Sequence, residues 1–196
     1  MYIHDTGGDS RTETAVERIR MLIRKATEKD IPEIAGLYDE IISLEEAGET
    51  TTGWLRGVYP TYETAEAGVG RGDMFLQEDG HGNITGAAVI NQIQVDCYAD
   101  GKWEYPAKDS EVMVIHTLVI SGSCLEKGYG SQFLSFYEDY AKEHGCWSLR
   151  LDTNAVNEAA RSFYKKHGYK EIGIVPTVFN GIPDVDLVLL EKKLIR

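Results

Sequence analysis

An apolar stretch followed by two closely spaced glycines could bind an anion. Residues 118–120 are typical of a β-strand, and Gly128 and Gly130 stand where a predicted helix begins. Glycine lets the backbone approach a ligand closely, and the free amides at the start of a helix point toward negative charge. The segment could therefore hold a phosphate or pyrophosphate group between a strand and a helix.

A second segment, one predicted strand further along the chain, offers two polar side chains. Asn157 stands at the start of a predicted helix, and Tyr164 lies about two turns later on it. An amide can both donate and accept hydrogen bonds, and a phenol keeps its proton at neutral pH. This helix could therefore supply a hydrogen-bonding amide and a proton donor beside the anion site.

Together the two segments resemble the acyl-CoA-binding core of the GNAT superfamily of N-acyltransferases. That pattern is Leu-x-Val, then Arg/Gln-x-x-Gly-x-Gly/Ala, then Asn-x-x-Ala-x-x-Phe/Leu-Tyr-x-x-x-Gly-Phe/Tyr. The chain is similar to it over residues 118–131 and again over residues 157–169. A single Gly-x-Gly is common in ordinary turns, so the resemblance depends on finding both motifs in the right order.

Two positions in the glycine loop depart from the family pattern. Leu125 stands where the family has Arg or Gln, and Glu126 stands where it often has Gly. The loop loses a cation and gains a carboxylate beside the expected phosphates, which repels them unless Glu126 turns to solvent or Lys127 compensates. The backbone amides remain, so we expect CoA binding to be weakened rather than abolished.

The resemblance implies an α/β fold with one GNAT-like domain. We expect a mixed, mostly antiparallel sheet of about six to seven strands, with helices on both faces and a splay between the two central strands. Residues 1–20 are polar and are expected to form a flexible leader before a domain that spans residues 21–196. The predicted strands are 21–26, 74–77, 84–95, 112–120, 147–151, 169–175 and 185–192, the predicted helices are 31–42, 61–69, 130–144 and 157–166, and residues 96–110 form a loop or a hairpin arm.

The resemblance also implies direct transfer of an acetyl group from acetyl-CoA to a primary amine of a small molecule or peptide. Tyr164 matches the family tyrosine that protonates the departing sulfur, and its alternative role is a core tyrosine. Asn157 matches the residue that meets the pantetheine arm, and its alternative role is a helix N-cap. The residues implied in cofactor binding are Leu118, Val119, Ile120, Glu126, Lys127, Gly128, Tyr129, Gly130, Ser131, Asn157 and Tyr164.

His116 is the first candidate for the base that deprotonates the amine. An ordinary histidine has a pKa of about 6.5, and side chains alternate along a strand, so His116 shares a face with Leu118 unless a bulge intervenes. The alternative is a core histidine bonded to a backbone carbonyl. Glu111 is the next candidate, Asp152 and Asp96 are not ranked, and a water relay would need no side chain at all.

The acceptor site is expected in residues 45–62 and 98–107. Both segments combine aromatic and acidic residues, as a pocket for a cationic or aromatic amine would, although the aromatics could equally make core or homodimer contacts. A rival hypothesis is a GNAT-like protein that has lost catalysis and acts as an acyl-CoA-responsive binding module. Leu125 and Glu126 favour that alternative, and the intact Asn157 and Tyr164 argue against it.

The composition limits the remaining classes of protein. A formal net charge of −12 argues against nucleic-acid binding, which needs a basic surface. The 196 residues contain neither an apolar run long enough to span a bilayer nor a signal-peptide core, so we expect a cytoplasmic protein without a membrane partner. Cys97, Cys124 and Cys146 show no paired spacing, so we expect neither a disulfide nor a metal site.

Overall fold

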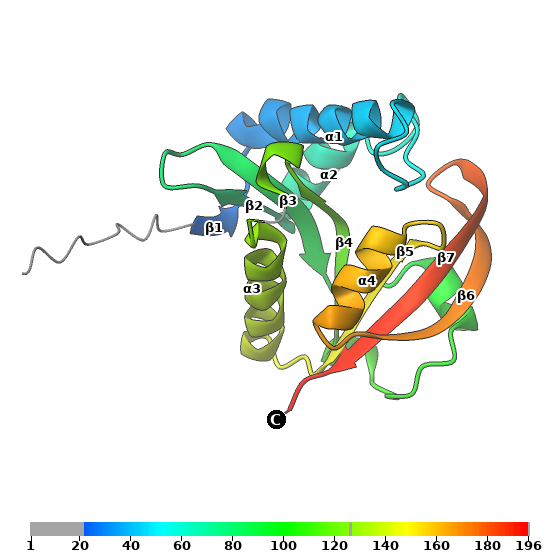
Figure 1. Cartoon of the computed structure of the whole chain (residues 1–196). Coiled ribbons are helices and arrows are strands. Elements are labelled where there is room, and N and C mark those ends of the chain that lie inside the picture. The colour runs from blue at the N-terminus through cyan, green and yellow to red at the C-terminus, as the bar shows by residue number, and fades with distance from the viewer. Residues whose placement is uncertain (1–21, 126, 196) are drawn as a thin grey trace, which may run out of the picture.

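A single seven-stranded sheet forms the centre of the protein (Figure 1). The computed structural model describes residues 22–125 and 127–195; the predicted leader, residues 1–20, lies outside them. All neighbouring strands are antiparallel except β4 and β5, so the prediction of a mixed, mostly antiparallel sheet is confirmed. In the order β1-β2-β3-β4-β5-β7-β6, the strands are β1 (Leu22–Lys25), β2 (Met74–Glu78), β3 (Ile84–Asn91), β4 (Val112–Ile120), β5 (Ser148–Asn154), β7 (Ile182–Lys193) and β6 (Lys170–Phe179).

Helices cover both faces of the sheet, as expected (Figure 1). The helices α1 (Ile31–Glu46) and α2 (Tyr62–Arg71) pack on one face, and α3 (Tyr129–Glu143) and α4 (Glu158–Lys166) pack on the other. Helix α1 buries an apolar stripe at helical spacing, including Ile34, which is why the sequence pattern predicted it. No helix within the described residues is long and apolar enough to cross a membrane.

Several element boundaries differ from the sequence prediction; β5, for example, continues to Asn154 rather than to residue 151, and β6 to Phe179 rather than to residue 175. Strand β3 ends at Asn91 rather than at residue 95, because the Asn91 side-chain oxygen accepts a hydrogen bond from the Ile93 amide at 2.9 Å and turns the chain. Residues 96–110 contain two short 3-10 helices, Asp96–Asp100 and the start of Asp109–Glu111, and no strand. The loop interpretation of this segment is therefore confirmed, and the hairpin arm is wrong.

The two parallel strands β4 and β5 separate after a short paired stretch. They pair only over Val112–Val114 and Ser148–Arg150, and each then continues without the other. Beyond that point β4 remains paired with β3, and β5 remains paired with β7. The predicted splay between the central strands is therefore present, and it leaves the facing edges of β4 and β5 without a strand partner.

Tyr137 of α3 lies where the two strands separate. Its buried hydroxyl donates a hydrogen bond to the carbonyl oxygen of Met113 on β4 at 2.6 Å and shares it with that of Arg150 on β5 at 3.2 Å. Carbonyl groups that leave a ladder inside a protein need another donor. One phenol thus satisfies backbone groups of both strands at the start of the splay.

We predict that Tyr137→Phe lowers the free energy of unfolding by about 1–3 kcal/mol, because two buried carbonyls lose their donor while the ring still fills its site. Urea denaturation of the two proteins measures this difference. The matched control is Tyr140→Phe, one turn later on α3, whose half-buried hydroxyl bonds to no described residue. An equal effect of both substitutions would show that the Tyr137 hydroxyl has no special role.

Candidate active site

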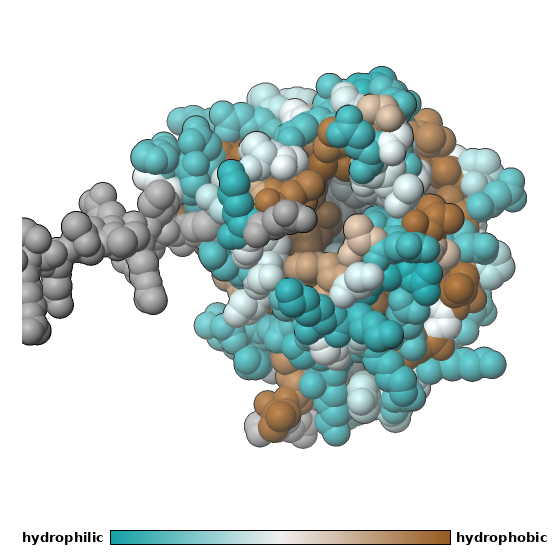
Figure 2. Space-filling model, in the orientation of Figure 1, coloured by the Kyte–Doolittle hydropathy of each residue, from teal (hydrophilic) through white to brown (hydrophobic). Residues whose placement is uncertain are grey.

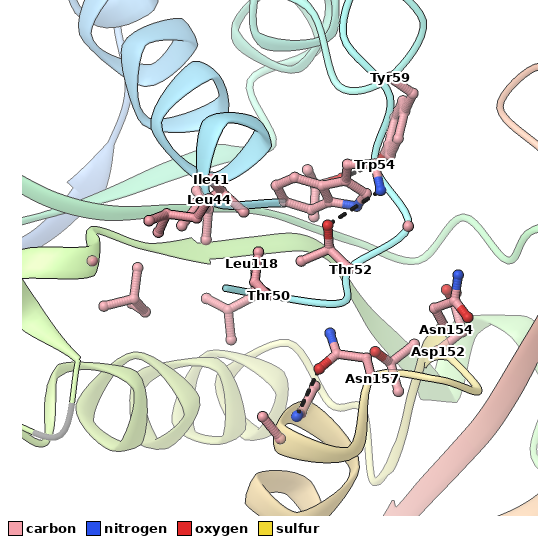
Figure 3. A pocket seen from close by; sticks show the side chains of 18 of the residues that line it. Ile41, Leu44, Thr50, Thr52, Trp54, Tyr59, Leu118, Asp152, Asn154 and Asn157 are labelled. Atoms are coloured by element: carbon pink, nitrogen blue, oxygen red, sulfur yellow. Dashed lines mark hydrogen bonds between the residues drawn. The ribbon is translucent and has the colours of Figure 1, made fainter. Parts of the chain in front are cut away.

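A cavity of about 650 Å³ fills the splay between β4 and β5 (Figures 2 and 3). Figure 2 shows it as a hollow with apolar side chains inside. Its walls come from α1, the loop of residues 49–54, the second half of β4, the end of β5 and the start of α4. The volume is within the range that binds small molecules and cofactors.

The two motif glycines stand where α3 begins, and a Cβ on Gly130 would lie 3.7 Å from Ile120, which lines this cavity. Gly128 is the N-cap of α3 and has φ of +85°, a left-handed conformation that side chains disfavour. A Cβ on Gly130 would lie 3.3 Å from the ring of Phe163 on α4, so this glycine lets the two helices approach. Leu125 lines the cavity with half of its surface exposed, whereas Glu126, with its predicted repulsion of phosphate, lies outside the described residues.

Two residues that the motif did not reveal hold the start of α3 in place. The Ser131 hydroxyl is 3.0 Å from Nε2 of His167, which joins α3 to the end of α4. The buried side-chain amide of Gln77 donates to the Tyr129 carbonyl at 3.2 Å. Both partners are distant in sequence, so only the fold shows that they support this turn. Lys127 is exposed to solvent beside it.

Asn157 caps α4 at the edge of the same cavity. Its side-chain oxygen accepts a hydrogen bond from the Ala160 amide at 3.1 Å, which confirms the N-cap interpretation. Figure 3 shows the side-chain nitrogen on the opposite side of the carboxamide, directed away from the helix. The nitrogen therefore remains available to a ligand, and a contact with pantetheine stays a prediction.

The phenol of Tyr164 is buried against the cavity of about 650 Å³ between β4 and β5, which we call the first cavity. Within residues 22–125 and 127–195 its hydroxyl has no hydrogen-bond partner. Burial, and then the charge of Asp152, raise the pKa of this phenol well above its usual value. Tyr164 is therefore protonated at neutral pH and can donate its proton into the cavity.

A β-bulge changes the alternation of side chains on β4. His116 pairs with Val89 and Val119 pairs with Ala87, so β4 has one more residue than β3 between these pairs. Thr117, inside the bulge, has φ of +52°. The side chains on the two sides of Thr117 therefore no longer follow the simple alternation of a strand.

The bulge places His116 on the face opposite to Leu118. The expectation of a shared face is thus corrected, because it held only without a bulge. Leu118 packs in the core on the α3 side, whereas His116 lines a second cavity, with Nε2 3.1 Å from the Asn91 side-chain oxygen. Burial lowers the pKa of His116 to about 4. The imidazole is therefore neutral at pH 7 and a weak proton acceptor, and its role as the base stays a prediction.

The second cavity, of about 520 Å³, meets the first along a shared boundary. The residues that line both cavities are Tyr59, Ile115, Thr117, Asp152 and Phe179. The hydroxyls of Tyr59 and Thr117 are hydrogen-bonded to each other, which links the loop before α2 to the bulge of β4. A molecule in the second cavity can therefore meet a molecule in the first near these five side chains, of which Asp152 is the ionisable carboxyl.

Asp152 is the acidic residue on that boundary. The Tyr98 hydroxyl donates a hydrogen bond to its Oδ2 at 2.8 Å, and no cation within the described chain forms an ion pair with it. Burial raises the pKa of Asp152 to about 6, although the bond from Tyr98 acts in the opposite direction. A carboxylate with this pKa is ionised at neutral pH and still accepts a proton readily.

The other proposed acids do not reach either cavity. Glu111 stands just before Val112, at the paired end of β4, and Asp96 is exposed at the start of a 3-10 helix. Neither lines a cavity. In the described part of the chain, no cluster of His, Cys, Asp and Glu has the arrangement of a metal site.

The two segments expected to build the acceptor site behave differently. In residues 45–62, Trp54 and Tyr59 line the first cavity. In residues 98–107, Tyr98 reaches Asp152, whereas Trp103 packs against Tyr98 and donates its indole N–H to the Tyr98 carbonyl at 2.8 Å. Trp103 therefore supports Tyr98 and lines neither cavity.

The chain is similar in sequence to two curated proteins that are named as N-acetyltransferases. The uncharacterized N-acetyltransferase YhfO of Bacillus subtilis is 35% identical over 60 residues, which are 31% of this chain and 40% of that protein. The probable N-acetyltransferase 14 of Xenopus tropicalis is 32% identical over 68 residues, which are 35% of this chain and 33% of that protein. The matches thus span less than half of either relative.

Solved structures show the same fold over most of the chain. A GNAT-family acetyltransferase from Streptococcus agalactiae superposes with a TM-score of 0.74 at 20% identity, over 90% of this chain and 96% of that one. One from Listeria monocytogenes gives 0.68 at 25% identity, also over 90% and 96%. The acetyltransferase (GNAT) family matches residues 39–169, a range that includes the glycine loop, both diverging strands and the helix of Tyr164. Since this match covers more than half of the sequence, the chain belongs to the GNAT family of acetyltransferases.

Proposed function

We propose that the protein transfers an acetyl group from acetyl-CoA to a primary amine of a small molecule or peptide. The observation that carries this proposal is the first cavity, which runs from Leu125, in the loop before α3, to the Tyr164 phenol through the splay between β4 and β5. A helix start favours phosphate, and an unpaired strand edge favours an extended amide chain. CoA carries both groups, a pyrophosphate and the extended amide chain of pantetheine.

The residues around the cavity fit acetyl-CoA part by part. The amides at Gly128 to Ser131 would receive the pyrophosphate, because the N-cap has no side chain to satisfy them. The edge of β4 at Leu118, Val119 and Ile120 would pair with the pantetheine amides, and Asn157 would add a donor from the other side. Bound acetyl-CoA supplies the reactive thioester carbonyl.

Tyr164 is our proposed proton donor to the sulfur that leaves. A thiolate departs more easily when a nearby acid supplies a proton. The Tyr164 hydroxyl is protonated, buried and without another described partner, so its proton is available for this step. The residue that deprotonates the amine has to be identified separately, because His116 is a weak proton acceptor and lines the second cavity.

The alternative function is an acyl-CoA-responsive binding module. It is favoured by a missing cation and an added carboxylate near the glycine loop. Leu125 is 54% exposed on the cavity wall, where the family pattern has a cation. Glu40 lines the same cavity and accepts a hydrogen bond from the Gly122 amide at 2.6 Å, which adds a carboxylate at this end. Both features would weaken phosphate binding, but neither removes the Tyr164 phenol.

We predict that the wild-type protein releases heat on titration with acetyl-CoA and that Gly130→Val weakens the affinity at least about tenfold, because the added side chain meets Phe163. Isothermal titration calorimetry measures this affinity. The matched control is Gly173→Val on β6, where a Cβ meets nothing within 4 Å. Absence of binding by the wild type, or equal weakening in both variants with unchanged melting, would contradict the donor site.

Tyr164→Phe keeps the ring and removes the proton, so we predict that kcat falls by roughly 10²-fold or more while acetyl-CoA affinity stays unchanged. Steady-state thiol release and calorimetry measure the two quantities. Tyr169→Phe is the matched control, because this buried neighbour has its ring centre 5.9 Å from that of Tyr164 and bonds to Glu138 instead. Full turnover by Tyr164→Phe would exclude Tyr164 from the chemistry.

A further inference from the structure

We propose that the second cavity binds a small, largely apolar primary amine and that Asp152 receives its ammonium group and takes its proton. This assignment rests on the proposed acetyl transfer and adds to it the acceptor site, the base and the class of substrate.

The first support for this assignment is the position of Asp152 between the two cavities. Asp152 follows the point where β5 leaves β4, and its side chain lines both cavities. Tyr59 and Thr117, joined by their hydrogen bond, line the same boundary. An amine held by Asp152 would therefore lie in the second cavity with its nitrogen directed toward the first, where Tyr164 also lies.

The charges of the second cavity point to a cationic ligand. Arg71 also lines it, but its guanidinium bonds to both oxygens of Asp73 at 2.9 and 3.2 Å. Asp73 is held further by the Asn91 amide at 2.8 Å, so this pair is close to neutral. Asp152 has no such cation among the described residues, so an ammonium ion would supply its missing counterion.

Asp152 is also the group around this boundary that titrates near neutral pH. The titratable groups that its charge reaches are Tyr59, Cys97, Tyr98 and Tyr164, and burial raises the pKa of all four, so they stay neutral. His116, on the wall of the same cavity, is neutral because burial lowers its pKa.

The proton transfers balance with these two residues. The ammonium nitrogen gives one proton to Asp152 and forms a bond to the acetyl carbon while the carbon–sulfur bond breaks. Tyr164 gives its proton to the sulfur and regains one from the new amide nitrogen. Asp152 then releases its proton to water, so one proton leaves for each acetyl group transferred.

The lining of the cavity indicates the rest of the acceptor. Val89, Ile93, Val95, Ile115 and Phe179 contribute apolar surface, and the volume suits a small molecule. Because Arg71 already forms an ion pair with Asp73, a carboxylate on the ligand would be buried in this cavity without a cation to pair with. We therefore expect phenylethylamine to be a better acceptor than phenylalanine, which differs from it by one carboxylate.

The first experiment compares wild type with Asp152→Asn, whose amide oxygen can still accept the Tyr98 hydrogen bond. We expect kcat/KM for phenylethylamine to rise with pH through about 6 in the wild type, because Asp152 must lose its proton first. Asp152→Asn should lack this rise and lose roughly 10²-fold in kcat/KM, with unchanged acetyl-CoA affinity and melting temperature. The control Asp96→Asn, exposed and outside both cavities, should match the wild type.

Tyr98→Phe separates proton transfer from a merely structural role. The Tyr98 bond stabilises the ionised carboxylate, so its removal should move the rise in kcat/KM to higher pH. An unchanged pH profile in Asp152→Asn, or wild-type activity in it, would overturn the assignment of the base.

The matched pair of acceptors tests the substrate class. We expect kcat/KM for phenylethylamine to exceed that for phenylalanine at least about tenfold. A preference for phenylalanine would overturn the apolar-amine assignment. If the wild type binds acetyl-CoA but releases no thiol with any amine, the proposed transferase function itself fails, and this outcome is distinct from an active enzyme that does not need Asp152.

Discussion

The separation of β4 from β5 is the constraint on which the rest of the structure depends. Two parallel strands cannot leave each other inside a protein unless their backbone groups find other partners. Here Tyr137 satisfies carbonyls of both strands at the start of the splay, while β3 and β7 hold the outer edges. The splay can therefore stay open and form a cavity instead of closing into a continuous sheet.

A single bulge then divides the chemistry between the two faces of the sheet. Without the extra residue at Thr117, His116 and Leu118 would lie on the same side of β4. With it, Leu118 faces the cavity proposed for the acyl donor, and His116 faces the cavity proposed for the amine. Asp152 approaches this boundary from β5, two residues after the last pair with β4, so the proposed reacting groups meet where β4 and β5 are no longer paired.

The local motifs made much of this arrangement predictable. The apolar run of β4, the glycines before α3 and the Asn157 cap each combine a short pattern with one backbone geometry, and the structure has all three elements. The bulge was not predictable, because it depends on the register between β3 and β4. Asp152 was one among 32 acidic residues, and its raised pKa comes from burial, which depends on the fold and exceeds the opposing effect of the hydrogen bond from Tyr98, a residue distant in sequence.

The central claim is that the splay brings acetyl-CoA and an amine together for direct transfer. The most direct measurement incubates the protein with acetyl-CoA and a panel of primary amines, and counts free thiol together with N-acetylated amine by mass spectrometry. Our account predicts thiol release that requires an amine, with one N-acetylated product for each thiol. Binding of acetyl-CoA without any acetylated amine, or thiol release that does not depend on the amine, would contradict it.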